Sequence, residues 1–413
     1  MPAKTVVILG GGVGGMIAAN QLRRRLTPDH RVVLVERNAN HAFAPSFLWL
    51  MTGDREPDQV RRPVATLLRR GVECVHASAE ALDLPKRRVT TSAGDLTFDY
   101  LIVALGAELA PDAIPGLAEA SQTFYTFEGA SRLHSALAAF AGGRIAVVVA
   151  AMPYKCPGAP HEGAMLIADY FRRTGRRQGM DMHLFTPEPQ PMPVAGPELG
   201  TAVVQMLEAK GIRFHGLHAL ASVDPAARTM QFQQGNTEQY DLLVAVPPHR
   251  APSLVRVAGL ANAAGWVIVN PQTLETQHDG VFAIGDVTAV PIPGRWKPDV
   301  PLMLPKAGVF AHVQAEVVAA RIAAEIGGRK PSKTFCGDGY CMLETGEDLA
   351  GFAYGNFFAE PSPQIHLRQI GKAWHIGKVL FERWWLSAPG WKRAAYGAML
   401  KTGGKLYGIP IAV

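Results

Sequence analysis

The sequence predicts an α/β protein with two Rossmann-like dinucleotide-binding domains and a C-terminal α+β domain that carries amphipathic helices. Three observations support this prediction: an N-terminal apolar strand that runs into a glycine-rich turn and a helix, further apolar runs of strand length, and proline clusters that interrupt the pattern. With 413 residues, 48% of them hydrophobic, the chain can bury about two or three cores.

The first 36 residues are expected to form a βαβ unit. Residues 5–9 and 31–35 are rich in β-branched side chains and indicate strands, and a helical pattern covers residues 16–26 between them. Because strands alternate with helical stretches, the sheets are expected to be mainly parallel. Further strands are expected in six apolar runs, at residues 100–105, 144–149, 182–185, 242–246, 266–269 and 281–284.

Proline-rich segments suggest where the domains begin and end. Prolines cluster near residues 111–115 and 247–252, and a last section begins near Pro331. The predicted domains are a dinucleotide-binding domain from residues 1–110 and 253–330, a second Rossmann-like domain over 111–252, and a C-terminal domain over 331–413.

A glycine pattern follows the first strand. Gly10, Gly12 and Gly15 form GxGxxG, in which the glycines permit a tight turn and a close approach of the backbone to a pyrophosphate. Glu36 ends the second strand 21 residues after Gly15 and is expected to accept a ribose hydroxyl. Its carboxylate would repel a 2′-phosphate, so NADP is disfavoured at this site.

The second glycine loop, expected after the strand at residues 144–149, is replaced by AAMPYKCP. Prolines at positions 153, 157 and 160 lack backbone N–H donors and stiffen the turn. This loop cannot cradle a pyrophosphate as a glycine loop does, so we expect the electrons to come from a donor smaller than NAD(P)H.

Two further segments resemble the two-dinucleotide-domain flavoproteins. Residues 273–286, TLETQHDGVFAIGD, resemble their second FAD motif, and residues 100–106, YLIVALG, resemble their strand-and-glycine signature. The resemblance implies FAD as cofactor, with Asp286 on its ribitol chain and with Gly106 and Gly285 as further cofactor-binding residues. From the residues alone, Asp286 could instead be a helix N-cap.

The two cysteine segments narrow the resemblance. CPGAPHE begins at Cys156, and GDGYCMLE places Cys341 185 residues later. With LPKAG and WHIGK in the same order, they resemble the sulfide:quinone oxidoreductases and the flavin subunit of flavocytochrome c sulfide dehydrogenase over essentially the whole chain. The resemblance implies a redox disulfide that hydrosulfide attacks, with Cys341 nearest the flavin and Cys156 carrying the sulfane sulfur. Two buried cysteines without a redox role remain the alternative.

Two charged residues are expected to assist this chemistry. Lys306 would place a cation near the N1 and C2 carbonyl end of the flavin and favour its reduced form, unless it is a solvated surface lysine. Glu162 is a candidate proton relay to sulfide or quinone, since an apolar pocket disfavours its charged form. The alternative for Glu162 is a helix-start carboxylate that interacts with the helix dipole.

The remaining cysteines receive no catalytic role. Cys74 lies in a strand-like pattern and is expected in the core, and Cys336 is expected to be a bystander. Members of the resembled family carry a third redox cysteine about thirty residues before the position of Cys156, where this chain has residues 123–127, TFYTF. This departure favours release of short polysulfide or transfer of sulfur to an acceptor.

Composition and spacing argue against other classes of site. The net charge of +6, with 18% charged residues, is too diffuse to indicate nucleic-acid binding. We assign no metal, because the histidines are not spaced as metal ligands; those considered are His161, His249, His312 and His375. No apolar run approaches the roughly 18 to 20 residues that span a bilayer, and no N-terminal export signal is expected.

The C-terminal region has the composition of interfacial amphipathic helices. Residues 372–405 hold seven Lys or Arg and one acidic residue, together with four of the seven tryptophans. Two apolar stripes predict monotopic binding to an anionic membrane, although such stripes can also be core or dimer contacts. The stripes are Leu380, Phe381, Trp384 and Trp385, and then Trp391, Tyr396, Met399 and Leu400; Phe381 and Trp374 are the candidate quinone contacts.

The predicted function is FAD-dependent oxidation of sulfide through Cys156 and Cys341, with electrons passed to a membrane quinone. The enzyme is expected at the cytoplasmic face of the membrane as a peripheral protein, and a homo-oligomer is compatible with the sequence. Three alternatives remain: a flavin subunit paired with a cytochrome c, a type II NADH:quinone dehydrogenase, and a redox-inert FAD-binding protein.

Overall fold

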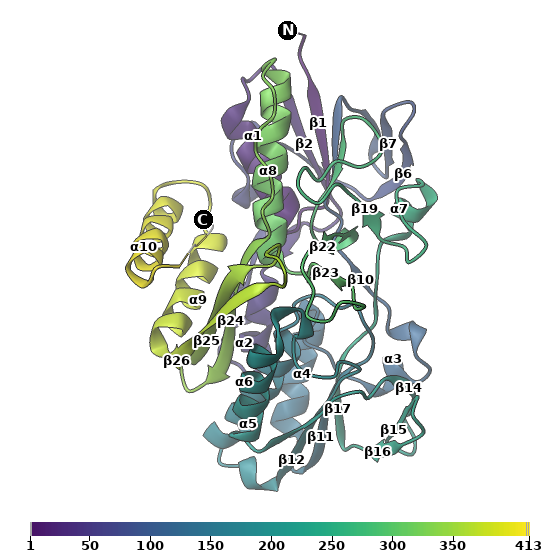
Figure 1. The fold of residues 1–413 in the computed structure, drawn as a ribbon, viewed down its shortest axis with the longest axis vertical. Coiled ribbons are helices and arrows are strands. Elements are labelled where there is room, and N and C mark those ends of the chain that lie inside the picture. The colour runs from purple at the N-terminus through teal and green to yellow at the C-terminus, as the bar shows by residue number, and fades with distance from the viewer. Residues whose placement is uncertain (1, 410, 412) are drawn as a thin grey trace.

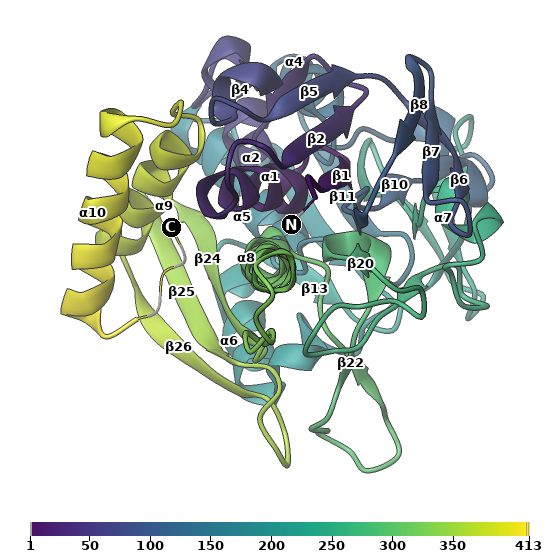
Figure 2. The same ribbon diagram turned by 90° about the horizontal axis from the view of Figure 1, so that it is seen from above.

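The first βαβ unit forms as predicted in the computed structural model, which describes residues 2–409, 411 and 413 (Figure 1). Five parallel strands make the sheet, in the order β20-β9-β1-β2-β5. Helices α1 (Val13–Arg25) and α8 (Gly308–Ile326) lie side by side against it (Figures 1 and 2). The strands are β1 (Thr5–Leu9), β2 (Arg31–Glu36), β5 (Glu73–His76), β9 (Tyr100–Val103) and β20 (Val281–Ala283).

A second parallel sheet has the order β13-β12-β11-β17. Helix α5 (Ala159–Arg173) is buried from Ala159 to Phe171, because it packs against this sheet, against α2 (Phe47–Met51) and against β24. The other elements here are β11 (Gly143–Val149), β12 (Met180–Phe185), β13 (Ile212–His215), β17 (Leu242–Val246), α4 (Phe127–Ala139) and α6 (Pro197–Glu208).

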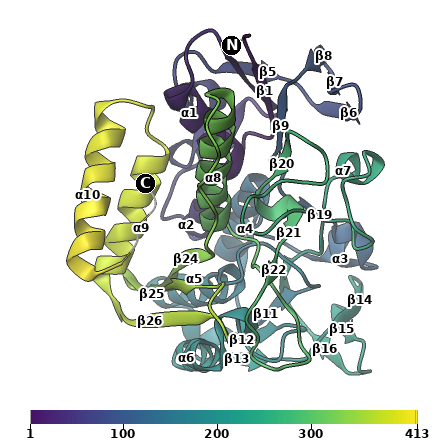
Figure 3. The ribbon, with the colours of Figure 1, turned by 45° about the horizontal axis from the view of Figure 1, so that its top comes forward.

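The C-terminal part is α+β, as predicted. Strands β24 (Asp338–Gly346), β25 (Leu349–Asn356) and β26 (Gln364–Gly371) form an antiparallel sheet. Helices α9 (Lys372–Trp385) and α10 (Trp391–Tyr407) follow as a hairpin, with α9 against the sheet and α10 on the outside (Figures 2 and 3). Strand β24 also contacts α5 and α8, and so joins the C-terminal part to both parallel sheets.

Short elements complete the fold, and the predicted strand at residues 266–269 is reduced to a two-residue strand. Two three-stranded antiparallel sheets contain β6 (Ala79–Asp83), β7 (Arg88–Thr91) and β8 (Gly94–Thr97), and β14 (Leu220–Asp224), β15 (Thr229–Phe232) and β16 (Thr237–Gln239). Paired short strands are β3 (Asn40–Ala42) with β4 (Arg61–Pro63), β10 (Glu108–Leu109) with β18 (His249–Arg250), β19 (Val267–Ile268) with β21 (Thr288–Ala289), and β22 (Pro291–Ile292) with β23 (Leu302–Met303); α3 (Leu117–Ala120) and α7 (Ser253–Val257) are single turns.

The expectation that Cys74 belongs to the core is wrong. Its strand exists, but β5 is the edge of the five-stranded sheet and pairs only with β2. The strand is therefore open to solvent, and Cys74 is exposed. The sequence pattern identified the strand and could not identify its place in the sheet.

The apolar stripe of α9 does not face outward, contrary to the expectation from composition. Trp384 and Trp385 are buried in the core beside the five-stranded sheet, with Leu380 and Phe381 packed against the same core. The indole nitrogen of Trp385 donates to Nε2 of His41 at 2.8 Å. The apolar stripe of α9 therefore faces the core of the protein.

Helix α10 keeps part of the predicted outward face. Leu400 is buried, whereas Trp391 is 76%, Met399 53% and Leu406 79% exposed. The exposed three are spaced by eight and seven residues, about two helical turns each, and so share one face. None of the helices in the described part of the chain is long and apolar enough to cross a membrane.

Replacing Trp385 tests the structural role of α9. We expect Trp385→Ala to destabilise the protein by about 3 to 5 kcal/mol, because it removes a large buried side chain. The thermal unfolding of the purified protein without lipid measures this effect. Trp391→Ala is the matched control and should change stability by no more than about 0.5 kcal/mol, because Trp391 is exposed. Equal melting temperatures for the two variants would contradict the assignment of α9 to the core.

Candidate functional site

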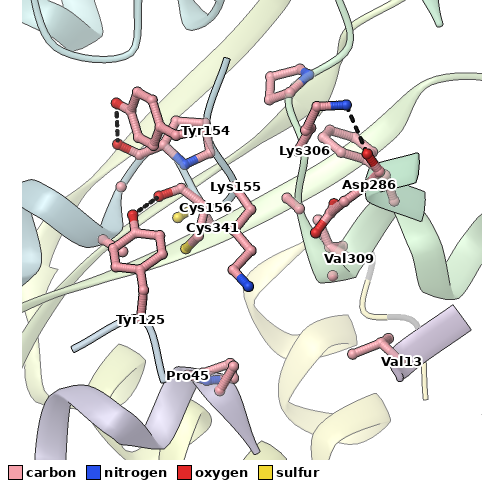
Figure 4. Close-up of a pocket in the computed structure, with 18 of the residues that line it drawn as sticks. Val13, Pro45, Tyr125, Tyr154, Lys155, Cys156, Asp286, Lys306, Val309 and Cys341 are labelled. Atoms are coloured by element: carbon pink, nitrogen blue, oxygen red, sulfur yellow. Dashed lines mark hydrogen bonds between the residues drawn. The ribbon is translucent and has the colours of Figure 1, made fainter. Parts of the chain in front are cut away.

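A cavity of about 1440 Å³ lies among loops of both parallel sheets and strand β24 (Figure 4). Pockets for a single small molecule usually measure about 300 to 1000 Å³, so this one has room for a dinucleotide and a second ligand. Its walls include the glycine turn, the Cys156 loop, the segment before α8, and α9. Residues from the sequence prediction that line it are Gly12, Glu36, Cys156, Glu162, Asp286, Lys306, Cys341 and Phe381.

The glycine turn has the geometry that a pyrophosphate requires. Gly10 has φ of +99°, and a Cβ on Gly15 would lie 1.8 Å from the carbonyl oxygen of Gly10. A Cβ on Gly12 would meet no atom within 4 Å, so the space in front of the helix N-terminus is open. Glu36 lies beside this space and accepts a hydrogen bond from the backbone N–H of Gly11 at 2.5 Å.

Asp286 fits the expected role at a polar cofactor chain. Its Oδ1 atom is buried and has no hydrogen-bond partner among the described residues, which is rare for a carboxylate. Burial raises the pKa of Asp286, and the nearby Lys155 and Lys306 offset part of that shift. Neighbouring Gly285, with φ of +73°, and Gly106, with φ of +67°, shape the turns at the ends of their strands and do not line the cavity.

Two lysines share the region where one was expected. The Lys306 ammonium donates to the carbonyl oxygens of Asp286 at 2.8 Å and Thr288 at 3.0 Å, and burial lowers its pKa to about 8. Lys155, which the sequence reasoning passed over, makes no hydrogen bond with its ammonium among the described residues and extends into the cavity in Figure 4. The sequence signal that could have identified Lys155 is its position next to Cys156.

The Cys156 loop is held in an unusual backbone conformation. Cys156 has φ of +56°, in the left-handed region that non-glycine residues rarely adopt and that clusters at functional sites. Its N–H donates to the carbonyl oxygen of Lys306 at 2.6 Å, and its own carbonyl accepts from the hydroxyl of Tyr125 at 3.4 Å. The first bond ties the loop after β11 to the segment before α8, and the second ties it to the segment before α4.

Cys341 lies close to the same loop. A Cβ added to Gly158 would be 3.3 Å from the Cys341 sulfur, and both cysteine sulfurs lie in one part of the cavity in Figure 4. Both are free thiols in this structure. Burial raises the pKa of the Cys156 thiol to about 12 and raises that of Cys341 well above its usual range, so a thiolate at either position needs a positive charge nearby.

Glu162 forms a buried ion pair with Lys378. Lys378 Nζ and Glu162 Oε1 are 2.5 Å apart, and the backbone N–H of Glu344 donates to the same oxygen at 2.8 Å. Burial raises the pKa of Glu162, while the carboxylates of Glu162 and Glu344 outweigh the effect of burial and raise that of Lys378. The pair therefore places two buried, oppositely charged groups at the wall of the cavity beside both cysteines.

A second buried carboxylate, Glu188, lines the cavity and was missed by the sequence reasoning. Its Oε2 accepts hydrogen bonds from the hydroxyls of Tyr154 at 2.8 Å and Thr186 at 3.1 Å. Burial raises its pKa to about 7. No local pattern marked this residue, since its environment forms only when β12 packs beside the Cys156 loop.

Of the two candidate quinone contacts, one lines the cavity and the other does not. Phe381 lines the cavity, and its ring is 6.5 Å from that of Tyr340, which precedes Cys341 and also lines it. Trp374 does not line the cavity, because its ring packs between Phe352 and Tyr407 at 4.9 and 5.1 Å. Tyr340 replaces Trp374 as a cavity aromatic.

The remaining candidates lie apart from this chemistry. Cys336 is exposed and lies near Thr334, with no cysteine partner. Within residues 2–409, 411 and 413, no group of three His, Cys, Asp or Glu side chains could hold a metal ion.

The cavity combines a glycine turn on a parallel sheet, an unpaired buried carboxylate and two cysteines, which indicates a dinucleotide-binding enzyme. Residues 4–315 match the family of pyridine nucleotide-disulphide oxidoreductases. The chain belongs to this family and, within it, to the sulfide–quinone reductases. It is therefore an oxidoreductase, and its family implies a flavin cofactor.

Individual relatives support the narrower assignment. The chain is 30% identical over 395 residues to a sulfide-quinone reductase of Aquifex aeolicus, covering 93% of this chain and 90% of that one. It is 26% identical over 378 residues to the mitochondrial sulfide:quinone oxidoreductase of Mus musculus, covering 86% and 79%. The crystal structure of the Aquifex aeolicus sulfide:quinone oxidoreductase superimposes with a TM-score of 0.82 at 28% identity, covering 92% and 90%.

Substitution of Gly12 tests whether the open space before α1 holds the cofactor. Gly12→Ala should leave folding intact, because its Cβ meets no protein atom, but should reduce the flavin that copurifies with the protein at least tenfold, by about 1.4 kcal/mol or more. Absorbance of the purified protein in the visible range measures this ratio. Gly403→Ala, which also meets no atom, should keep the flavin of the wild type. Full flavin content in Gly12→Ala would place the cofactor elsewhere.

Proposed function

We propose that this protein is an FAD-dependent sulfide:quinone oxidoreductase that oxidises sulfide to sulfane sulfur or polysulfide through a disulfide between Cys156 and Cys341. The observation that supports this most is the position of both sulfurs in one cavity beside a dinucleotide turn, one on the loop after β11 and the other on β24. Electrons then pass to a membrane quinone.

The residues around the cavity are suited to FAD. Gly12 leaves space for a pyrophosphate at the N-terminus of α1, Glu36 offers a carboxylate to a ribose, and Asp286 offers one to the ribitol chain. When bound, FAD supplies a two-electron carrier between sulfur and quinone. Lys306 holds the loop that contains Asp286, and Lys155 and Lys306 together place positive charge near the site.

The sulfur step follows from the two cysteines. Hydrosulfide attacks the sulfur of Cys156, the bond to Cys341 breaks, and a persulfide on Cys156 and a thiolate on Cys341 result. Burial strongly disfavours that thiolate by raising the pKa of both thiols. The positive charge of Lys378 opposes this rise, and the thiolate requires it. Glu162, paired to Lys378, is the proton relay of this site.

Long polysulfur chains are disfavoured at this site. Phe124 and Tyr125 line the cavity in the segment where the resembled family carries a third redox cysteine, and Tyr125 bonds to the Cys156 carbonyl. Their rings fill the space next to the loop. Release of short polysulfide, or transfer of one sulfur to an acceptor, fits this arrangement.

The Cys156 loop argues against the alternative of a type II NADH:quinone dehydrogenase. The loop follows β11 at the position of a second dinucleotide turn, and its prolines provide no N–H donors for a pyrophosphate. No feature of the cavity favours a cytochrome partner or a redox-inert protein over these two enzymes.

Quinone would enter from the side of α9, where Phe381 and Tyr340 line the cavity. The exposed face of α10 provides a peripheral membrane contact at the cytoplasmic face, with the apolar Trp391, Met399 and Leu406 and with exposed Lys401 and Lys405 next to them. Such a contact would place the cavity near a lipid-soluble quinone.

Anaerobic addition of sulfide to the purified protein tests the sulfur chemistry. The flavin absorbance of the wild type should bleach and then recover when decylubiquinone is added. Cys156→Ser and Cys341→Ser should each lower the bleaching rate by about 100-fold or more, the range seen when a reacting group is removed. Cys336→Ser should behave as the wild type, because Cys336 is exposed and away from the cavity. Bleaching by NADH and not by sulfide would replace this proposal with the NADH dehydrogenase.

Cosedimentation with anionic liposomes tests the membrane contact. The double variant Trp391→Ala with Leu406→Ala should bind to lipid at least about tenfold less. Each of these exposed side chains would contribute about 1.5 to 3 kcal/mol on insertion into lipid. Leu217→Ala removes an equally exposed leucine, 67% accessible, from another surface and should bind as the wild type. Unchanged binding of the double variant would exclude α10 as the contact.

A further inference from the structure

The proposed reaction requires a proton from solvent in each turnover. Hydrosulfide yields sulfane sulfur, two electrons and one proton, whereas a quinone takes two electrons and two protons to become a quinol. The sum, HS⁻ + quinone + H⁺ → sulfane sulfur + quinol, leaves one proton to be supplied. The pair that faces the cavity cannot exchange it directly, because the Lys378 and Glu162 side chains are only 8% and 3% exposed.

Further titratable groups lie between that pair and the surface. Glu344 lies next to it, since its N–H donates to Glu162, and its carboxylate contributes to the raised pKa of Lys378. Glu344 Oε2 accepts a hydrogen bond from Nδ1 of His375 at 2.9 Å. His375 Nε2 is 3.6 Å from Oδ1 of Asp348, whose side chain is 80% exposed.

The carboxylate of Glu344 lacks a hydrogen bond that an ordinary structural ion-pair partner would have. Its side chain is 1% exposed, and its Oε1 atom is buried with no hydrogen-bond partner among the described residues. A buried carboxylate that serves only stability normally has both oxygens satisfied, because an unpaired one costs about 1 to 3 kcal/mol. The unpaired oxygen of Glu344 leaves an acceptor free to receive a proton.

We propose that Glu344 and His375 conduct protons between the solvent near Asp348 and the Glu162–Lys378 pair at the cavity. This inference rests on the proposed function and adds the route by which the quinone half of the reaction receives its proton. Glu344 and His375 do not line the cavity, so they act through Glu162 and Lys378 as positioning residues.

The groups around His375 suit a residue that gains and loses a proton. Glu344 raises its pKa through their hydrogen bond, and the charge of Asp348 adds to this, while burial and Lys378 oppose it. The ring also packs edge-on against Trp49, centroids 5.9 Å apart, with Arg55 on that indole. A pKa raised above 6.5 keeps His375 protonated further into the neutral range, where it can donate.

Two variants separate the two halves of the reaction in the holoenzyme. With Glu344→Gln and with His375→Ala, bleaching by sulfide should stay within about twofold of wild type, because that half takes up no outside proton. Reoxidation by decylubiquinone should slow at least about tenfold, and more so at high pH, because its proton supply is interrupted. Imidazole in the medium should restore His375→Ala. His366→Gln, an exposed histidine of β26, should behave as wild type at every pH.

The pKa of His375 can be measured without turnover, so this test of the proton path does not depend on the proposed reaction. NMR titration of the His375 ring should give a lower pKa in Glu344→Gln than in wild type, because the first cause of its raised pKa is removed. If the wild type shows no sulfide-dependent quinone reduction, the proposed function fails and the titration still decides whether the dyad is coupled. An unchanged His375 pKa overturns the path, as does wild-type reoxidation in both variants or a slow rate in His375→Ala that imidazole does not restore.

Discussion

The ion pair of Glu162 and Lys378 holds together the parts of the chain that make the site. Glu162 lies in the first turn of α5, six residues after Cys156, and Lys378 lies on α9. The N–H of Glu344, three residues after Cys341, bonds to the same carboxylate. Burying two charges is expensive unless their remaining hydrogen bonds are made, which fixes the geometry of all three segments. This contact thus brings the Cys156 loop, α9 and the part of β24 that carries Cys341 to a common cavity.

The Cys156 loop departs from the glycine turn that a second dinucleotide site would require. It occupies the place of a glycine turn after β11, but its backbone N–H is used by the carbonyl of Lys306 and its φ is positive. Since prolines remove further donors, the loop presents a side chain where a glycine turn would present N–H groups. Lys155, next to the cysteine, extends into the space thereby left open.

The two C-terminal helices have different structural roles. Helix α9 belongs to the cofactor side of the molecule: Trp385 bonds to His41, His41 in turn bonds to the carbonyl of Gly11, and Glu382 binds Arg55 and Ser46. Burial lowers the pKa of His41 to about 4, so this link stays neutral and intact at ordinary pH. Helix α10 has no such internal contacts along its Trp391 face, which leaves that face for an external surface.

The sequence by itself determined the features that depend on local chain chemistry. The strands, the turn with Gly12, the proline loop at Cys156 and the carboxylate of Asp286 are each encoded within a few neighbouring residues, and the structure contains them. Only the tertiary structure decided which surface each element buries. Cys74 is exposed because β5 is an edge strand, and the α9 stripe is buried because it meets the five-stranded sheet. Trp374 lies outside the cavity. The Lys306 ammonium donates hydrogen bonds, whereas that of Lys155 makes none among the described residues. Glu344 and His375, 31 residues apart, become a pair only when β24 and α9 pack together, because burial and partner choice arise from contacts distant in the chain.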